Sequence, residues 1–515
     1  MSILGGMNIA KTALNVNQFA LNVVSNNIAN MNTEGYLKQR VELAELQGYT
    51  PYSTFTGLKI YRGGGVGISD ISQYNNQIGL DNINGQNSTL SSLSSELEGL
   101  NGLADILNEL GDGALSAALT DFYAAAQYLT QNPSDSVLRI NYVNAAETVA
   151  EAFNKISSEL DDTRSDLVGN LDYPDSINHS QAGLLVTEIN DTLKQIAAVN
   201  DTILRSPNGT NELINQRNQL LQDLSSLVDF DVKTNSNGTI NIQIAGVDVV
   251  KGSEQACQLT ISAGDDANPA KVAIQTFDDP PKVKVADIRE HIDGGQLSGV
   301  LNAASSTAEG ITFQKVYDQI NLLAKTFAKS VNDIQMHNDG NTAAMAIGLD
   351  ANGNEILVPS TEPLFVIPAD GNINAANIKI NQTIYDNPNL VAAARVELDA
   401  AGKPVDNKAI GDSDNLKEIL NLQDKNFGEL GGVTIATALN NLVTKVGLEA
   451  NDLKARVDAQ TSIVDQATTN YAAIGGVNLD EELIDMIKYQ RAYEAASRVV
   501  TACNEMLQVL VTLGQ

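Results

Sequence analysis

The distribution of proline constrains this chain of 515 residues more than any other feature. All twelve prolines lie between Pro51 and Pro404, which leaves residues 1–50 and 405–515 without the residue that most reliably breaks a helix. Both ends of the chain are therefore predicted to form long helices.

Apolar residues recur every seven positions at both ends. The two stripes consist of Met7, Leu14, Leu21 and Ile28 at the start and of Leu479, Met486, Tyr493, Val500 and Leu507 at the end. Such a repeat forms a narrow seam that is typical of paired helices. Because isolated helices are marginal in water, we expect the ends to pair antiparallel with each other or to pack on another subunit, loose in the monomer and fixed in an assembly. The alternative, docking on the chain's own core, remains open.

The middle of the chain mixes helical and strand-like patterns. Helical stripes such as Leu93, Leu100 and Leu107 give way to alternation around Ile240, after a turn at 236–238. The predicted fold is mainly α with inserted β, a long helical bundle or coiled coil carrying a central β-hairpin module. The predicted segments are an N-terminal helix with an extended segment (1–75), a helical rod (76–228), a β-rich module (229–300), a helix (301–340), a small irregular or β insertion (341–430), a helix (431–475) and the C-terminal helix (476–515).

Charge and cysteine content exclude several classes of protein. Lys and Arg total 32 against 63 for Asp and Glu, and the net charge of −31 repels both phosphate backbones and anionic lipids. We therefore expect neither nucleic acid nor membrane as a partner. Cys257 and Cys503 are too few for a disulfide framework or a thiolate zinc site. The first thirty residues contain no uninterrupted apolar core of a secretory signal, so no cleaved signal peptide is expected.

The search for catalytic or metal-binding groups returns no candidate. His179, His291 and His337 are widely separated and lack partners at ligand spacing. The stretch 350–355 begins like a calcium loop but has Glu355 where glycine is required, so it is interpreted as a turn. We predict that the chain is not an enzyme and holds no cofactor or metal.

The two ends carry a resemblance to a known family. Residues 25–36 closely resemble the N-terminal signature of bacterial flagellar axial proteins, the rod, hook and hook-associated subunits, and residues 476–493 resemble their C-terminal helix motif. Asn and Gly can end a helix, and Asp and Glu suit the first turn of the next one. The motif residues are Asn26, Asn27, Ile28, Ala29, Asn30, Asn32, Thr33, Gly35 and Tyr36, with Asn478, Leu479, Asp480 and Glu481.

Internal features narrow the resemblance to the hook-associated branch of this family. The glycine turn at 65–71, the helix at 213–220 and the overall length are similar to those of that branch, which implies a reduced outer β domain within 341–430. The chain departs from the family at two places. Gln73 and Asn76 stand where Arg and Asp are usual, and Asn215 and Asn218 flank Arg217 where Asp is common, so salt bridges at these places are in doubt.

The resemblance implies a structural adaptor that polymerises at the distal end of the hook and joins it to the filament. The implied partners are other copies of the chain, the hook protein, the next hook-associated junction protein, and a cytoplasmic export chaperone that holds the C-terminal helix. The implied location is extracellular, at the hook–filament junction, after type III export without a cleaved signal peptide.

Other functions stay open at this point. Within the family, the alternative is a hook or distal rod subunit. Outside the family, one alternative is a secreted cell-wall-acting enzyme with a catalytic pair in 230–430, and another is a coiled-coil signalling or adhesion protein.

Overall fold

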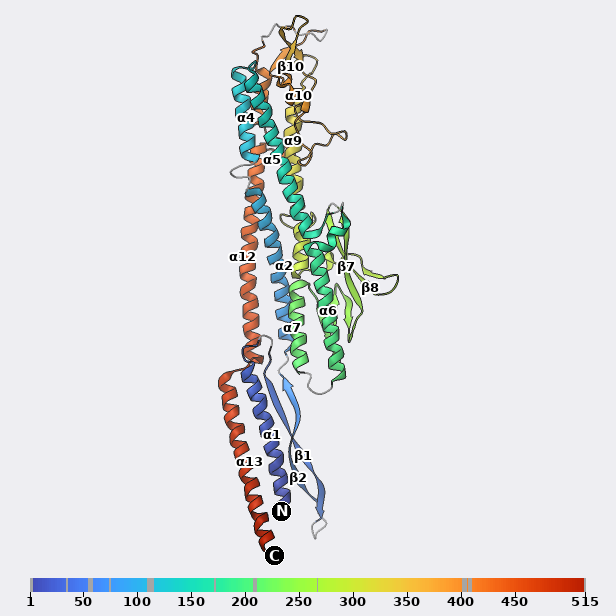
Figure 1. Cartoon of the computed structure of the whole chain (residues 1–515), viewed down its shortest axis with the longest axis vertical. Coiled ribbons are helices and arrows are strands. Elements are labelled where there is room, and N and C mark those ends of the chain that lie inside the picture. The colour runs from blue at the N-terminus through green and yellow to red at the C-terminus, as the bar shows by residue number, and fades with distance from the viewer. Residues whose placement is uncertain are drawn as a thin grey trace.

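The computed structural model shows an elongated helical rod with both chain ends at one extremity (Figure 1). It describes residues 3–33, 36–53, 59–73, 76–108, 115–170, 173–206, 211–265, 267–400, 405 and 410–513. Most of these residues are helical, and the described strands form four small antiparallel sheets. The predicted mainly α fold with inserted β is confirmed. Within the described residues, no helix combines the length and apolar character needed to cross a bilayer.

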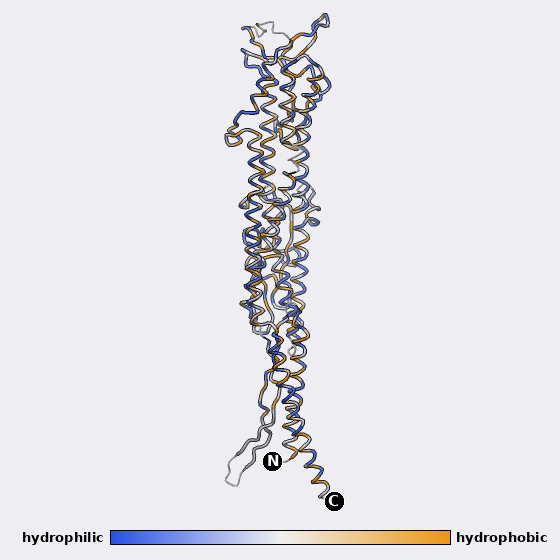
Figure 2. Tube along the Cα trace, turned by 90° about the vertical axis from the view of Figure 1, so that its left-hand side faces the viewer, coloured by the Kyte–Doolittle hydropathy of each residue, from blue (hydrophilic) through white to orange (hydrophobic). Residues whose placement is uncertain are grey.

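One extremity is a unit that we call the terminal module. Helix α1 lies between helix α13 on one side and a two-stranded ribbon on the other (Figure 1). The helices α1 and α13 run antiparallel, which confirms the predicted packing of the two ends. Apolar residues recur along both helices (Figure 2). The elements are α1 (Ile3–Ala29), β1 (Gln39–Ser53), β2 (Lys59–Gln73) and α13 (Leu479–Leu513).

The glycine run in β2 packs against α1. Gly65 has φ +105°, and a Cβ atom at this position would overlap the Thr12 hydroxyl. The backbone N–H of Val66 donates to Thr12 Oγ1 at 3.3 Å. The glycine turn expected at 65–71 lies inside β2, which begins at Lys59 and pairs with β1 on both sides of a register shift at the glycines.

The middle of the rod consists of long helices that pack closely on one another. Helix α8 crosses α2 where a Cβ atom on Gly299 would overlap the backbone oxygen of Ser92, so only small residues fit at this crossing. Ser88, Ser92 and Ser95 of α2 are buried for the same reason. The helices are α2 (Gln77–Asn108), α6 (Gln181–Arg205), α7 (Asn211–Leu227), α8 (Gly295–Ala304) and α12 (Ile435–Gly475).

Two small sheets cover one side of α6 and share its hydrophobic core. The predicted hairpin corresponds to β3 and β4, and the predicted boundary at residue 300 divides α8, because Leu297 and Val300 belong to this same core. The strands are β3 (Asp231–Thr234), β4 (Ile240–Ile244), β5 (Val247–Lys251), β6 (Glu254–Gln255), β7 (Cys257–Asp265), β8 (Asn268–Thr276) and β9 (Val283–Val285).

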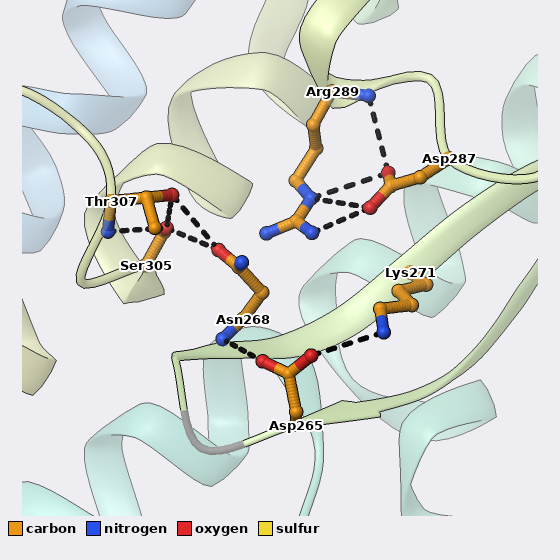
Figure 3. Close-up of polar contacts among 7 residues, drawn as sticks. All are labelled: Asp265, Asn268, Lys271, Asp287, Arg289, Ser305 and Thr307. Atoms are coloured by element: carbon orange, nitrogen blue, oxygen red, sulfur yellow. Dashed lines mark hydrogen bonds and ion pairs between the residues drawn. The ribbon is translucent and has the colours of Figure 1, made fainter.

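Polar contacts fasten the β7–β8 turn to the end of α8 (Figure 3). Asn268 Oδ1 accepts hydrogen bonds from Ser305 Oγ at 2.5 Å and from Thr307 Oγ1 at 3.1 Å. Nearby, Arg289 donates through Nε and Nη2 to the carboxylate of Asp287. The bonds of Asn268 hold the β7–β8 turn against the end of α8, whereas the pair of Arg289 and Asp287 is local to its own segment.

The distal end is organised around aromatic rings. Phe122, Tyr142, Phe153, Phe327 and Phe365 belong to one core, so segment 341–430 packs directly on the rod helices. The elements here are α4 (Leu115–Gln131), α5 (Ser136–Val168), α9 (Phe313–Gln335), β10 (Thr342–Leu349), β11 (Glu355–Pro359), α10 (Gln382–Asp386), η3 (Pro388–Leu390), β12 (Ala394–Glu397), α11 (Asp414–Asn421) and η4 (Gly428–Leu430). Two further short helices, η1 (Pro174–His179) and η2 (Arg289–His291), lie instead beside the core of α6 and the small sheets.

A buried arginine ties this segment to α5. The Arg139 side chain is 1% exposed, and it donates through Nε to the carbonyl of Pro133 at 2.7 Å and through Nη1 to the carbonyl of Val391 at 2.7 Å. Nη1 also lies 3.2 Å from the carbonyl of Asn389. Burial lowers the pKa of Arg139 to about 10.

We predict that Arg139→Met loosens the distal end. The substitution leaves several buried carbonyl groups without a donor, which costs roughly 2–4 kcal/mol. Hydrogen–deuterium exchange in the 386–396 backbone should rise, while exchange in the terminal module stays unchanged. Arg205→Met is the control, because Arg205 is exposed and its pair with Asp201 contributes about 0.5 kcal/mol or less. Equal exchange in the two variants would contradict the prediction.

A candidate assembly interface at the paired termini

The seam between α1 and α13 is built mainly from small side chains. On α13, the residues that face α1 follow a seven-residue spacing through Glu482, Tyr489, Ala496 and Cys503. Gly6 of α1 packs near the Cys503 sulfur. On α1, the buried side chains are Ala10, Val16, Ala20, Val23, Val24 and Asn27.

The large residues of the predicted stripes lie at the edges of this seam. Five of the nine belong to α13: Met486, Val500 and Leu507 are half-buried, whereas Leu479 and Tyr493 are exposed. On α1, all four of Met7, Leu14, Leu21 and Ile28 are half-buried. The pattern of large residues therefore locates the helices, but it does not reveal that alanine and cysteine fill the centre of the seam.

One end of the seam is closed by a polar cluster that we call the latch, formed by Asn27, Lys38 and Glu482. The Glu482 side chain is 1% exposed, and its Oε1 lies 2.8 Å from Lys38 Nζ. Asn27 Nδ2 donates to Glu482 Oε2 at 3.0 Å. A buried carboxylate is stable only with such partners, so the latch fixes how the two ends of the chain meet.

The N-terminal motif supplies the rest of the latch. Asn27 bonds the backbone of Gln39 twice, accepting from its N–H at 3.1 Å and donating to its carbonyl at 2.9 Å. The Tyr36 hydroxyl donates to Asn27 Oδ1 at 2.9 Å, and Asn26 Nδ2 donates to that hydroxyl at 3.2 Å. Burial and the charge of Glu482 raise the pKa of Tyr36. The motif thus folds the chain back from α1 into β1.

The other motif residues have local roles or are exposed. Asn478 Oδ1 accepts from the backbone N–H groups of Asp480 and Glu481 and so caps α13. Asn30 Nδ2 donates to the carbonyl of Asn26, and Thr33 donates to Asn30. Ala29 and Asn32 are exposed, and Gly35 lies outside the described residues.

The charge of Lys38 is shared between two carboxylates. Its Nζ lies 3.0 Å from Glu481 Oε2 as well as beside Glu482. Burial alone would lower the pKa of Lys38, but the hydrogen bonds to Glu482 and Glu481 outweigh burial and raise it. The ammonium is therefore held charged in the folded terminal module.

The joint between the terminal module and the rod is made of neutral polar groups. Gln73 Nε2 donates to Asn215 Oδ1 at 2.6 Å, Asn211 Nδ2 donates to the carbonyl of Ile71 at 2.9 Å, and the Lys38 backbone N–H donates to the carbonyl of Gly475 at 2.9 Å. At the two positions where the resemblance implies an Arg and an Asp, Gln73 and Asn215 form an amide pair.

The polar residues beside this joint are buried without an ion pair. Arg217 donates to Asn200 Oδ1 at 3.2 Å and to the carbonyl of Gly238 at 2.8 Å, and burial lowers its pKa to about 10. Asn218 is buried, and within the described residues no ion pair joins Arg217 to a carboxylate.

The outward surface of α13 is unusually apolar for a surface helix. Ile484 and Ile487 are 65% and 57% exposed. Further exposed apolar side chains of this helix are Leu483, Val499, Met506, Val509, Leu510 and Val511. Exposed apolar rows of this kind mark interaction surfaces.

No comparable site for chemistry is found in the part of the chain that the structure describes. A cavity of about 520 Å³ between α2 and α12 is lined by Glu96, Glu449 and Arg456, and its described lining contains no histidine, serine or cysteine. Burial raises the pKa of Glu96, and the hydrogen bond from Asn302 opposes this shift. No group of three His, Cys, Asp or Glu side chains in the described ranges could hold a metal ion.

Comparison with known proteins assigns the family. The helical domain of the flagellar hook-associated protein FlgK matches residues 100–350, the flagella basal body rod protein family matches residues 7–36, and the C-terminal family of the flagellar basal body rod FlgEFG proteins matches residues 470–513. The chain belongs to the flagellar hook-associated protein family. The motifs that build the latch are therefore the family's terminal motifs, and the matched helical domain covers most of the rod.

Relatives match over nearly the whole chain. Flagellar hook-associated protein 1 of Bacillus subtilis is 27% identical, covering 98% of this chain and 97% of the relative. The proteins of the same name from Salmonella typhimurium and Escherichia coli are 25% and 24% identical, each covering 98% of this chain and 99% of the relative. The flagellar hook junction protein FlgK from Burkholderia pseudomallei has a similar fold, with TM-score 0.57, 16% identity, and coverage of 76% of this chain and 99% of that one.

We predict that Glu482→Ala separates the terminal helices of this hook-associated protein. Breaking a buried ion pair by removing one partner costs about 3–5 kcal/mol. Limited proteolysis of the full chain should then cleave α13 much faster than in the wild type. The control is Glu481→Ala, because Glu481 is largely exposed where it meets Lys38.

A second variant separates loss of charge pairing from loss of volume. Replacing both Lys38 and Glu482 by Met removes the buried charges together, so much of the protection should return. Proteolysis of α13 at the wild-type rate in Glu482→Ala would contradict the role of the latch.

Proposed function

We propose that this chain is a structural adaptor subunit that polymerises at the distal end of the flagellar hook and joins the hook to the filament. The observation that carries this proposal is the terminal module. Its two helices are held together by the family motifs, yet α13 leaves Ile484, Ile487 and other large apolar side chains in water. Full burial of each such side chain contributes about 1.5–3 kcal/mol, which neighbouring subunits supply in an assembly.

In this proposal, the half-buried stripe residues form part of the contact between subunits. Met7, Leu14, Leu21 and Ile28 are only partly covered by α13, and Val500 and Leu507 only partly by α1. In the assembled state, neighbouring copies cover the remaining surface of both rows. The stripes thus serve as the assembly interface around a seam that the monomer already forms.

The partners follow from the position of a junction subunit. Other copies of this chain, the hook protein and the next hook-associated junction protein make contact with it in the flagellum. A cytoplasmic chaperone covers the apolar surface of α13 before export, because this surface would otherwise associate too early. The protein leaves the cell by flagellar type III export without a cleaved signal peptide, and its place is the extracellular hook–filament junction.

Two alternative functions receive less support. A hook or distal rod subunit shares the terminal motifs, but the helical-domain match over 100–350 is to a hook-associated protein. A cell-wall-acting enzyme receives no support from the comparisons, because the matching family models and the relatives named above are flagellar rod and hook-associated proteins. We therefore propose that the chain is not an enzyme.

Deletion of the gene tests the function. We expect cells with intact hooks, no filaments, and filament subunits released into the medium, because the junction that anchors the filament is missing. Electron microscopy of the cells and analysis of the medium give the result, and expression of the wild-type chain should restore filaments. Loss of hooks together with filaments would instead indicate a hook or rod subunit, and normal filaments would refute the proposal.

Truncation of α13 tests the chaperone. A chain that ends before Leu479 should lose a cytoplasmic partner that co-purifies with the full-length chain from flagellated cells. The matched control is Ser136→Ala on α5, which leaves α13 intact. A partner retained by the truncated chain would contradict binding at this helix.

A further inference from the structure

The terminal module and the rod meet end to end, and few contacts join them (Figure 1). Among the described residues, no helix or strand of the terminal module packs along a helix of the rod. The two parts also have separate hydrophobic cores. When the interface between two parts of a chain is small and polar, relative motion of the parts is the expected behaviour.

The hydrogen bonds across the joint hold it weakly. Gln73 donates to Asn215, but the amide oxygen of Gln73 is buried and has no partner within the described ranges. Two further hydrogen bonds across the joint involve backbone groups. Neutral hydrogen bonds of this kind add little net stability, because water offers equivalent partners to each group.

The chain crosses the joint twice, after Gln73 and after Gly475. At the second crossing, a Cβ atom on Gly476 would overlap the backbone oxygen of Ala472, so only glycine allows the chain to leave α12 in this way. The Lys38 backbone N–H meets the carbonyl of Gly475 at the same crossing. The two crossings therefore define an axis about which the terminal module can tilt.

One side of the joint is open. A pocket of about 260 Å³ lies between the C-terminal end of α1 and helix α7, and Asn26 and Asn30 face Gln216 and Gln219 across it. Glu212 is the one charged residue in the described lining. Within the described residues, no hydrogen bond or ion pair links α1 to α7 across this pocket. Neither packing nor charge repulsion therefore keeps the walls apart.

The amide groups on the two walls can pair with each other. Each amide carries donors and an acceptor, so amides that approach one another exchange hydrogen bonds to water for hydrogen bonds to protein. These bonds are of the same neutral kind as those that hold the joint in the present structure. We propose that the joint is a hinge, in which the terminal module tilts about the two chain crossings between this open form and a closed form where Asn26 and Asn30 meet Gln216 and Gln219.

The terminal module moves as one body in this hinge. The latch ties α13 to α1 and to the start of β1, so the tilt is absorbed at the chain crossings and not within the module. The role of the hinge rests on the proposed function. A junction subunit meets hook subunits on one side and the next junction protein on the other, and two tilts let one subunit fit two different neighbours.

Distances between spin labels on the purified full chain test the hinge. Ala29→Cys on α1 and Thr202→Cys on α6 place labels at exposed positions on the two sides of the joint. We expect two distances for this pair, one for the open form and one for the closed form. The native Cys257 and Cys503 are buried and escape labelling.

Two matched pairs control for motion inside each part. Within the terminal module, Lys11→Cys and Arg498→Cys place labels on exposed positions of α1 and α13. Within the rod, Thr202→Cys and Ser462→Cys place them on exposed positions of α6 and α12. Each control pair should show a single distance, because the hinge moves neither part internally.

Charges placed on the two walls of the pocket should shift the balance. Asn30→Lys with Gln216→Glu puts opposite charges across the pocket and favours the closed form. Asn30→Glu with Gln216→Glu puts like charges at the same positions and favours the open form. The ratio of closed to open chains should differ by at least about fivefold between the two variants.

Three results would overturn the hinge. One is a single distance across the joint in the wild-type background, and another is the same ratio of distances in the two charge variants. The third is a second distance in the control pair of the terminal module, because the helices would then separate instead of tilting together. The purified chain gives these results independently of whether the wild-type chain restores filaments in cells, which decides the proposed function.

Discussion

The buried carboxylate of Glu482 is the interaction on which the terminal module depends. Its partners Lys38 and Asn27 lie more than 440 residues away in the chain, and its side chain is 1% exposed. An ion pair in such a place adds little net stability compared with apolar packing, but a mispaired charge is strongly destabilising. Its physical role is therefore to fix register, because an antiparallel seam of alanines and valines could otherwise slide by one turn.

The hydrophobic core of the terminal module is separate from the cores of the rod. The rod has two large cores of aromatic and aliphatic side chains, whereas the terminal module has a small separate cluster around Ala20, Val23 and Val41. The terminal module and the rod are joined by hydrogen bonds such as the one between Gln73 and Asn215. The rod can hold its fold by its own burial, whereas the terminal module, with its small apolar cluster, relies on the latch.

The sequence was sufficient to predict the long terminal helices, their pairing and the inserted β regions, because proline placement and heptad spacing are local signals. The sequence did not reveal which helix face forms the seam. The heptad pattern was assigned from large apolar residues such as Leu14 and Tyr493, whereas the small residues Ala496 and Cys503 fill the centre of the seam. The role of Asn27 was also hidden, because its bonds to Glu482 exist only after folding brings the two ends together. The N-terminal motif therefore identified Asn27 and Tyr36 as important residues, but it did not reveal the contacts that they make.

An asymmetric arrangement of surfaces suits a subunit that must connect two different structures. If the faces of the terminal module were alike, copies would pair by two-fold symmetry and association would stop at the dimer. In this terminal module, α13 and the ribbon lie on opposite sides of α1 and are different surfaces. The latch serves this geometry directly, because a one-turn slip of α13 along α1 would move Ile484 and Lys488 by about 5 Å relative to the ribbon.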